Sequence, residues 1–236
     1  MADNDFIQPP FPSPTQRWHN RVYSSIDATR PELSLKGKTV LITGAGSGIG
    51  RETAKAFAAA GASTIHLLGG RREGLLHETQ EAVHASHPHT QVTVYSGDIS
   101  NHGWAKTAVA TIDGWDVLVL NACYLPKPAK LLDADLDDWA KAWDVSLKGN
   151  LELLQGLLPK RNPGASVIGT SSIIINLDPP FAVGLAPYAL TKMAMSKMFE
   201  VFSVEVPDVH WVTFHPGSGR FGGYVMQGYN RSRTCS

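Results

Sequence analysis

Two residues near the end of the chain have the types and spacing for proton transfer. Tyr188 and Lys192 stand four apart in "APYALTKMAM", so on a helix their side chains share one face. The ammonium of Lys192 would favour the phenolate and lower the pKa of Tyr188 from about 10 towards working pH. Upstream, "IGTSSIII" places Ser171 and Ser172 at the end of an apolar run. Open α/β sheets bind ligands at the carboxyl ends of their strands, so these serines are candidate partners of the pair.

A glycine-rich turn precedes these residues by more than a hundred positions. The apolar run "TVLIT" leads into Gly44-x-x-x-Gly48-Ile49-Gly50, and an alanine-rich segment follows without a break. Glycines at a strand-to-helix turn let a pyrophosphate approach the backbone, and the free amides of the helix N-terminus then receive its charge. The spacing therefore predicts a dinucleotide site. The alternative is a glycine-rich turn that binds nothing.

The end of the second apolar run indicates which dinucleotide binds. An acidic residue there would hold a ribose 2′-hydroxyl, but the chain reads "LLGGRRE" and offers Arg71 and Arg72. A guanidinium suits a 2′-phosphate, which favours NADP(H), with NAD(H) as the second choice. The alternative is a pair of arginines exposed to solvent.

The elements that must position these residues alternate along the chain. Apolar runs predict buried parallel strands over 39–43, 63–68, 91–97, 116–122, 165–171 and 209–216. Helical segments are expected between them at 48–60, 73–86, 101–112, 135–157 and 187–205. This alternation predicts an α/β fold with a doubly wound parallel sheet of the Rossmann type. It defines a domain over 37–217, an extended N-terminal arm over 1–36 and a short irregular tail over 218–236. The last edge strand of such a sheet is expected to be missing.

Composition excludes several classes of protein. Lys plus Arg and Asp plus Glu number 21 each, so no net field attracts nucleic acid or an anionic membrane. No apolar run reaches the roughly 18 residues that span a bilayer, and the first residues do not resemble a secretory signal. Cys123 and Cys235 are too few for a disulfide framework, and the histidines of "HASHPH" lack the spacing of metal ligands. A cytoplasmic protein without a metal is expected.

Together these motifs resemble the short-chain dehydrogenases/reductases over about residues 37–217. The resemblance rests on "TGAGSGIG", "GDIS", "NAC", "SS", "YALTK" and "PG", and the N-terminal phrase beginning "RWHNRVYSS" is similar to fungal members. It implies that Tyr188 is the general acid or base, that Lys192 holds the nicotinamide ribose, and that Ser172 orients the substrate oxygen. It also implies a set of cofactor-binding residues, namely Gly44, Ser47, Ile49, Gly50, Asp98, Asn121 and, facing the nicotinamide, Gly217. A homo-oligomer is implied as well.

Three departures from the family pattern stand beside this resemblance. Ser146 occupies the place of an asparagine that helps hold a water in a proton relay, with Asn150 one turn further on. The spacing from Ser172 to Tyr188 is a few residues longer than usual, in a loop that could line the substrate pocket. The chain ends nineteen residues after Gly217, so the mobile lid is expected to be missing with the edge strand.

The expected function is an NADP(H)-dependent oxidoreductase that moves a hydride between nicotinamide and a ketone or secondary alcohol. The substrate would be a small molecule, with secondary metabolism as the expected setting. Ser146 and the short C-terminus support an alternative, a catalytically impaired cofactor-binding protein of the same fold. A methyltransferase is a more distant alternative because it needs no Tyr188, Lys192 and Ser172 together.

Overall fold

The computed structural model describes residues 22–70, 72–101 and 103–217. Its centre is a six-stranded parallel sheet in the order β3-β2-β1-β4-β5-β6. The strands are β1 (Thr39–Thr43), β2 (Thr64–Leu68), β3 (Gln91–Tyr95), β4 (Trp115–Leu120), β5 (Arg161–Thr170) and β6 (His210–Phe214). The order reverses between β1 and β4, which creates the crevice where doubly wound sheets bind ligands. All six strands predicted from the sequence are confirmed.

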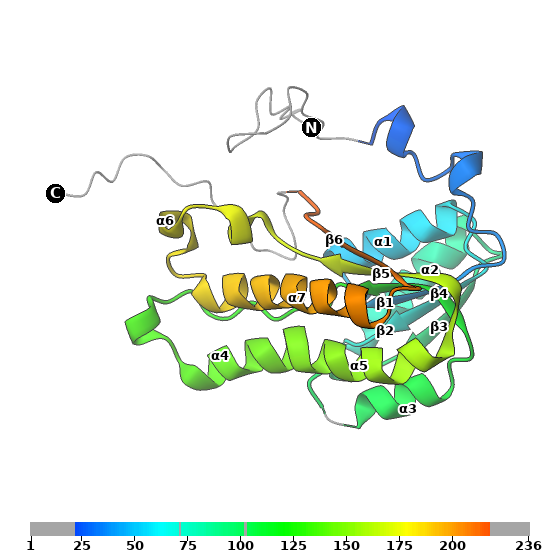
Figure 1. The fold of residues 1–236 in the computed structure, drawn as a ribbon. Coiled ribbons are helices and arrows are strands. Elements are labelled where there is room, and N and C mark those ends of the chain that lie inside the picture. Colours follow the sequence, from blue (N-terminus) through cyan, green and yellow to red (C-terminus); the bar gives the residue numbers. More distant parts are fainter. Residues whose placement is uncertain (1–21, 71, 102, 218–236) are drawn as a thin grey trace.

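Helices cover both faces of the sheet (Figure 1). The longer ones are α1 (Gly48–Ala59), α2 (Glu73–Ser86), α3 (Trp104–Ala110), α4 (Leu136–Trp143), α5 (Gly149–Leu157) and α7 (Ala186–Glu205). Shorter helical pieces are η1 (Ser24–Ile26), η2 (Pro31–Leu33), η3 (Leu131–Asp133), η4 (Asp144–Lys148), η5 (Leu158–Lys160), η6 (Ile173–Asn176) and α6 (Pro179–Ala182). None of the helices in these ranges combines the length and apolarity of a membrane span.

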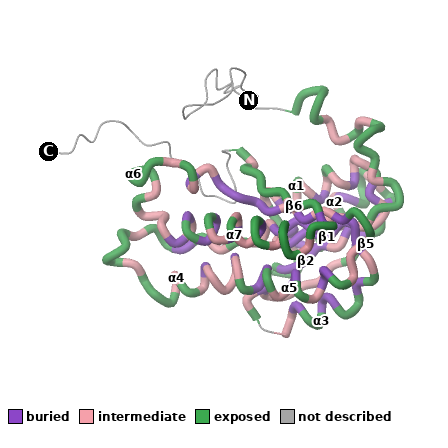
Figure 2. The backbone as a smooth tube through the Cα atoms, viewed as in Figure 1, coloured by how far each residue is buried: buried purple, intermediate pink, exposed green. Residues whose placement is uncertain are grey.

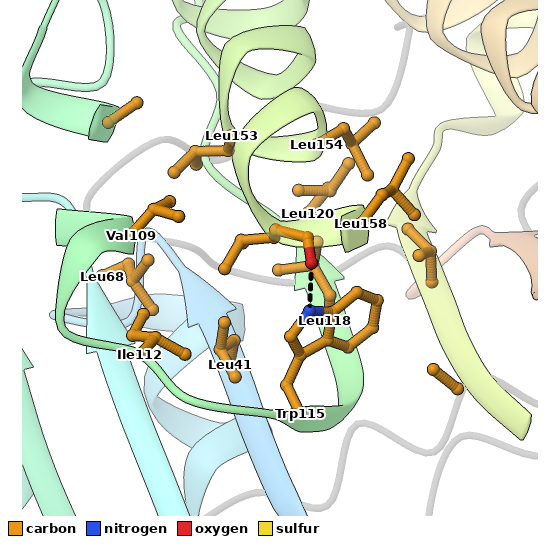
Figure 3. Close-up of a cluster of buried hydrophobic side chains, with 14 of the residues drawn as sticks. Leu41, Leu68, Val109, Ile112, Trp115, Leu118, Leu120, Leu153, Leu154 and Leu158 are labelled. Atoms are coloured by element: carbon orange, nitrogen blue, oxygen red, sulfur yellow. Dashed lines mark hydrogen bonds between the residues drawn. The ribbon is translucent and has the colours of Figure 1, made fainter. Parts of the chain in front are cut away.

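Two apolar cores form, one on each face of the sheet. One lies under α1 and α2 and includes Ala54, Leu76 and Val83. The other lies under α3, α5 and α7, and Trp115 is its largest fully buried side chain. The indole of Trp115 donates a hydrogen bond of 2.7 Å to the carbonyl of Leu157, so its one polar atom is satisfied among leucines (Figure 3). Figure 2 shows buried residues concentrated in the central strands of the sheet, whereas β6 is largely exposed.

The helix predicted over 135–157 is interrupted. Its middle, η4, is a π-helical turn, in which the amide of Gly149 bonds to the carbonyl of Asp144 five residues earlier. The side-chain amide of Asn150 donates to the carbonyl of Ser146 at 2.8 Å and so supplies a donor inside this irregular turn. Because η4 packs against α7, the interruption lies beside the helix that carries Tyr188.

The prediction that the last strand is buried is wrong. β6 pairs with β5 alone among the described strands, and Val212 is 50% exposed. One face of β6 is covered by α7, where Trp211 stacks on Phe202 with ring centres 4.9 Å apart.

The tail over 218–236 and the first 21 residues of the arm lie outside the described residues, so the expectations about them stay predictions. In the described part of the arm, the backbone amide of Leu35 donates a hydrogen bond to the carbonyl of Ala60.

Candidate active site

The glycine-rich turn joins β1 to α1 at the carboxyl end of the sheet. Gly44 and Gly48 have φ of +66° and +53°, values that favour glycine. A Cβ on Gly50 would lie 2.3 Å from the carbonyl oxygen of Gly44, so this position admits no side chain. Ser47 stands at the N-cap of α1 without a side-chain cap bond, Ile49 follows in the first turn, and no acidic residue lies in that turn. The amides of this helix end are therefore available to an anionic pyrophosphate.

Side chains of α1 and α2 donate hydrogen bonds to the backbone of the glycine-rich turn. Arg51 donates to the carbonyl of Gly46 at 2.8 Å and to the carboxylate of Glu78 at 2.8 Å. Thr79, which is fully buried, donates to the carbonyl of Ala45 at 3.0 Å. These bonds fix the backbone of the turn before any ligand arrives, which lowers the entropy cost of binding.

The residues expected to contact the adenosine part of the cofactor are two arginines after β2 and one aspartate after β3. Arg71 lies outside the described residues, and Arg72 is exposed at the N-cap of α2. Asp98 lies beyond β3, where its Oδ1 accepts hydrogen bonds from the amide and the hydroxyl of Ser100 at 3.0 and 2.7 Å. The carboxylate is thereby held at the edge of the crevice.

Asn121, the first residue after β4, connects three strand ends. Its side-chain amide donates to the carbonyls of Thr43 and Gly44 at 3.1 and 3.4 Å. Its Oδ1 accepts from the hydroxyl of Thr170 at 3.4 Å. A Cβ on Gly44 would lie 3.1 Å from this amide, so the asparagine and the glycine turn are in close contact.

Ser172, Tyr188 and Lys192 come together at the end of β5 and the start of α7. Ser172 is 4% exposed, and its hydroxyl is close enough to the phenol of Tyr188 to act on the pKa of that phenol. The ammonium of Lys192 lies 5.6 Å from the centre of the Tyr188 ring and donates to the carbonyl of Thr170 at 2.6 Å. Lys192 is 3% exposed. The structure thus brings together the three residues that the sequence proposed for the chemistry.

The expected direction of the Tyr188 pKa is wrong for the chain without a cofactor. Burial raises the pKa of Tyr188 above its ordinary 10.0, the nearby Cys123 raises this pKa further, and the hydroxyl of Ser172 opposes the rise. The charge of Lys192 is not among the influences that shift the pKa of Tyr188 here. Burial also lowers the pKa of Lys192.

Ser146 and Asn150 are both buried, in or next to the π-helical turn η4. Ser146 is 3% exposed, and its hydroxyl accepts a hydrogen bond of 3.4 Å from the amide of Tyr124. Asn150 is 1% exposed and is therefore not a solvated helical asparagine. Its Oδ1 has no hydrogen-bond partner within the part of the chain that the structure describes. An acceptor buried in this way is a place for a bound water.

Cys123 is a site residue that the sequence analysis missed. In the sequence it counts only as one of two cysteines too few for a disulfide framework, whereas in the structure it lies three residues beyond the end of β4 at Leu120 and is exposed. Cys123 is also close enough to Tyr188 and Lys192 to influence the pKa of each. The only signal in the sequence was a cysteine where the resembling family prefers glycine.

Gly217, three residues after the end of β6, has a φ of +90° and donates its amide to the Nδ1 of His215 at 3.1 Å. Within the described ranges, no three histidine, cysteine, aspartate or glutamate side chains gather as a metal site would require.

Comparison with known proteins identifies the family and the fold. The sequence model of the short chain dehydrogenases matches residues 38–218. The chain belongs to the short-chain dehydrogenase/reductase family. It is 30% identical to the short chain dehydrogenase/reductase AacuD of Aspergillus aculeatus, over 88% of this chain and 72% of that protein. It is 32% identical to the short chain dehydrogenase citE of Monascus ruber, over 85% and 70%.

Solved structures of this family have the same fold. One, from Escherichia coli CFT073, is described as a short chain dehydrogenase complexed with NADPH. It superposes with a TM-score of 0.70 at 24% identity, over 78% of each chain. The resemblance to fungal short-chain dehydrogenases/reductases predicted from the sequence is confirmed by these comparisons, and so is the doubly wound parallel sheet.

Proposed function

We propose that this chain is an NADP(H)-dependent oxidoreductase that interconverts a ketone and a secondary alcohol on a small molecule. The observation that carries the proposal is the meeting of Ser172, Tyr188 and Lys192 beside a glycine turn whose helix N-terminus is open to an anion. Its proposed setting is secondary metabolism, and its proposed location is the cytoplasm.

In reduction, the nicotinamide supplies the hydride to the carbonyl carbon when it is bound. Ser172 donates a hydrogen bond to the substrate oxygen and orients it. Tyr188 delivers its phenolic proton to that oxygen. The raised pKa of Tyr188 keeps the phenol protonated at neutral pH, which is the form that a general acid needs. Lys192 stabilises the phenolate formed in this step, because its ammonium lies over the tyrosine ring.

The preference for NADP(H) is proposed from the basic end of β2. Arg71 and Arg72 follow Gly69 and Gly70, and no carboxylate stands there to hold a ribose 2′-hydroxyl. Two structural neighbours, described as complexes with NADP and with NADPH, are consistent with this choice. NAD(H) is the second choice.

The proposed substrate carries its carbonyl on an apolar body. Two segments flank Tyr188, one after β4 and one between β5 and α7, and the amide of Ala129 bonds to the carbonyl of Gly184 to link them. Apolar side chains on both segments are partly exposed, including Leu125 at 37% and Val183 at 67%. Apolar ketones are therefore the first substrates to test, with small polyhydroxy ketones for comparison.

A catalytically impaired cofactor-binding protein is the second candidate. Ser146 favours it, because its hydroxyl accepts from the amide of Tyr124 and does not provide the carboxamide that the family pattern implies. The partnerless Oδ1 of Asn150 favours the active enzyme, since one turn away it can accept a hydrogen bond from a bound water.

A homo-oligomer is part of the proposal. Apolar side chains are exposed on α4 and α7, which lie side by side (Figure 1). They include Leu136 at 78%, Met193 at 51% and Val204 at 80%. Burial of these side chains against a second copy would remove them from water.

The first experiment is a titration of the purified chain with NADPH and with NADH, measured by energy transfer from tryptophan to the bound nicotinamide. Tighter binding of NADPH, weakened in Arg71→Ala and Arg72→Ala, is expected. Oxidation of NADPH is then followed at 340 nm with the ketone panel. Binding without turnover of any ketone supports the impaired protein, and equal affinity for the two cofactors contradicts the NADP(H) preference.

A further inference from the structure

The segment that follows β4 forms one wall of the proposed site and is held from outside by one carboxylate. Asp138 lies in the first turn of α4. Its Oδ1 accepts a hydrogen bond of 2.6 Å from the phenol of Tyr124, and its Oδ2 accepts one of 2.7 Å from the backbone amide of Lys127. Both carboxylate oxygens of Asp138 thus accept hydrogen bonds from the same short segment of chain. We call residues 123–130 the β4 wall.

The carboxylate is itself held in place. Asp135, the N-cap of α4, accepts from the amides of Asp137 and Asp138 at 2.9 and 3.1 Å and so fixes the first helical turn. The ammonium of Lys141, one turn further along α4, lies 4.6 Å from the centre of the Tyr124 ring. Tyr124 is therefore held by two interactions, a hydrogen bond from its hydroxyl to Asp138 and a cation–π contact of its ring with Lys141.

The β4 wall connects the cofactor side of the site to the catalytic helix. Its first residue, Cys123, lies near Tyr188 and Lys192. The amide of the next residue, Tyr124, bonds to Ser146 in the π-helical turn beside α7. Close to the other end, Ala129 bonds to Gly184, four residues before Tyr188. Movement of this wall would displace whatever substrate lies against Tyr188.

These contacts also explain what Ser146 does in this chain. A serine there is short enough to accept the Tyr124 amide at 3.4 Å while remaining 3% exposed. The carboxamide of Asn150 meanwhile satisfies the Ser146 carbonyl. The serine that replaces the family's asparagine at position 146 therefore provides one more hydrogen bond to the β4 wall, through the amide of Tyr124.

We infer that Asp138 is the positioning residue of the β4 wall, with the Tyr124 hydroxyl and the Lys127 amide as its two attachments. Through this wall it sets the KM for the carbonyl substrate and leaves the affinity for NADP(H) unchanged. The inference rests on the proposed function, because it assigns the substrate to the space between the wall and Tyr188. Asp138 touches neither cofactor nor reacting atoms, so it acts only through the residues it holds.

The test compares Tyr124→Phe and Asp138→Asn with the matched control Asp137→Asn. Tyr124→Phe removes one hydroxyl. Asp138→Asn turns an amide towards the donor of one attachment, which breaks that hydrogen bond and frees one end of the attached segment. Asp137 is exposed, and its carboxylate makes no hydrogen bond within the described ranges, so its variant removes the same charge from the same helical turn.

Each wall variant is expected to raise the KM for the ketone by about tenfold, with kcat within about twofold and the NADPH affinity unchanged. The control is expected to match the wild type. Hydrogen–deuterium exchange is the second readout, because it needs no turnover. The amides of 123–130 should exchange faster in Asp138→Asn than in Asp137→Asn, with the rest of the sheet unchanged.

The outcomes separate this inference from the proposed function. Equal KM values in Asp138→Asn and Asp137→Asn would overturn the inference even if the enzyme reduces ketones well. Unchanged exchange over 123–130 would overturn it as well. If the wild type binds NADPH but turns over no ketone, the proposed function fails. The exchange measurement then decides alone whether Asp138 holds the wall.

Discussion

The ammonium of Lys192 lies 5.6 Å from the centre of the Tyr188 ring, on a helix where the two residues are one turn apart. Lys192 is almost fully buried, and within the described residues its ammonium makes one hydrogen bond, to the carbonyl of Thr170 at the end of β5. An ammonium has three donors, so two are left to serve a ribose hydroxyl and a water. The lysine therefore joins the strand end, the tyrosine and the expected place of the cofactor.

Removal of the Tyr188 hydroxyl should abolish turnover without loss of binding. Tyr188→Phe keeps the ring against which Lys192 lies and removes the group that transfers the proton. We expect kcat to fall by about 10²–10⁴-fold, while the NADPH affinity stays within about twofold of the wild type. Stopped-flow measurement of NADPH oxidation and the binding titration test the two halves. Turnover at the wild-type rate would contradict the assignment of Tyr188 as the general acid.

Lys192 should not be replaceable by arginine. The side chain is 3% exposed and lies between Thr170 and the Tyr188 ring, so a planar guanidinium cannot take its place without displacing them. We expect both Lys192→Met and Lys192→Arg to lower kcat by at least about 100-fold. Circular dichroism of each variant confirms that it folds. An active Lys192→Arg enzyme would show that charge alone suffices.

The phenol of Tyr188 should titrate above its ordinary pKa of 10.0 in the cofactor-free chain, because burial opposes the phenolate. The folded state then holds its proton more tightly than the unfolded state. The resulting stability is fully present below pH 10.0 and is lost as the pH rises through the folded-state pKa. The difference in absorbance at 295 nm between the wild type and Tyr188→Phe measures this pKa. A midpoint below 10.0 would mean that Lys192 outweighs burial.

Gly50→Ala should both destabilise the fold and remove cofactor binding. The added Cβ would lie 2.3 Å from the Gly44 carbonyl and 2.8 Å from the Asn121 amide, so the turn must shift. We expect the free energy of unfolding to fall by about 1–3 kcal/mol.

Gly74→Ala is the control for that variant, because a Cβ on this exposed glycine of α2 would contact nothing within 4 Å. It should raise the free energy of unfolding by about 0.5–1 kcal/mol and leave binding intact. Urea denaturation measures both variants. Equal stability of the two would contradict the close packing at Gly50.

The order and type of the elements were accessible from the sequence because their signals are local. "TVLIT" and "DVLVLNA" are apolar runs of strand length, and strands buried on both faces need no other pattern. The spacing of Tyr188 and Lys192 likewise follows from the geometry of one helix. The glycine turn could be recognised because its backbone requirement depends on residues adjacent in the chain. The break of 135–157 at η4 had no such signal, since the π-helical turn depends on how Asn150 and α7 meet it.

The sequence by itself determined which residues stand at the carboxyl ends of the strands: Ser172 after β5, Asn121 after β4 and Gly44 after β1. Only the tertiary structure decided the burial, the pKa shifts and the long-range hydrogen bonds around these residues. The pKa of Tyr188 rises because segments far apart in the chain bury it, and that burial cannot be read from its neighbours in sequence. The same holds for the bonds of Asp138 to Tyr124 and Lys127, which span 14 and 11 positions. Local spacing specifies elements, whereas electrostatics and side-chain attachments depend on which elements the fold places together.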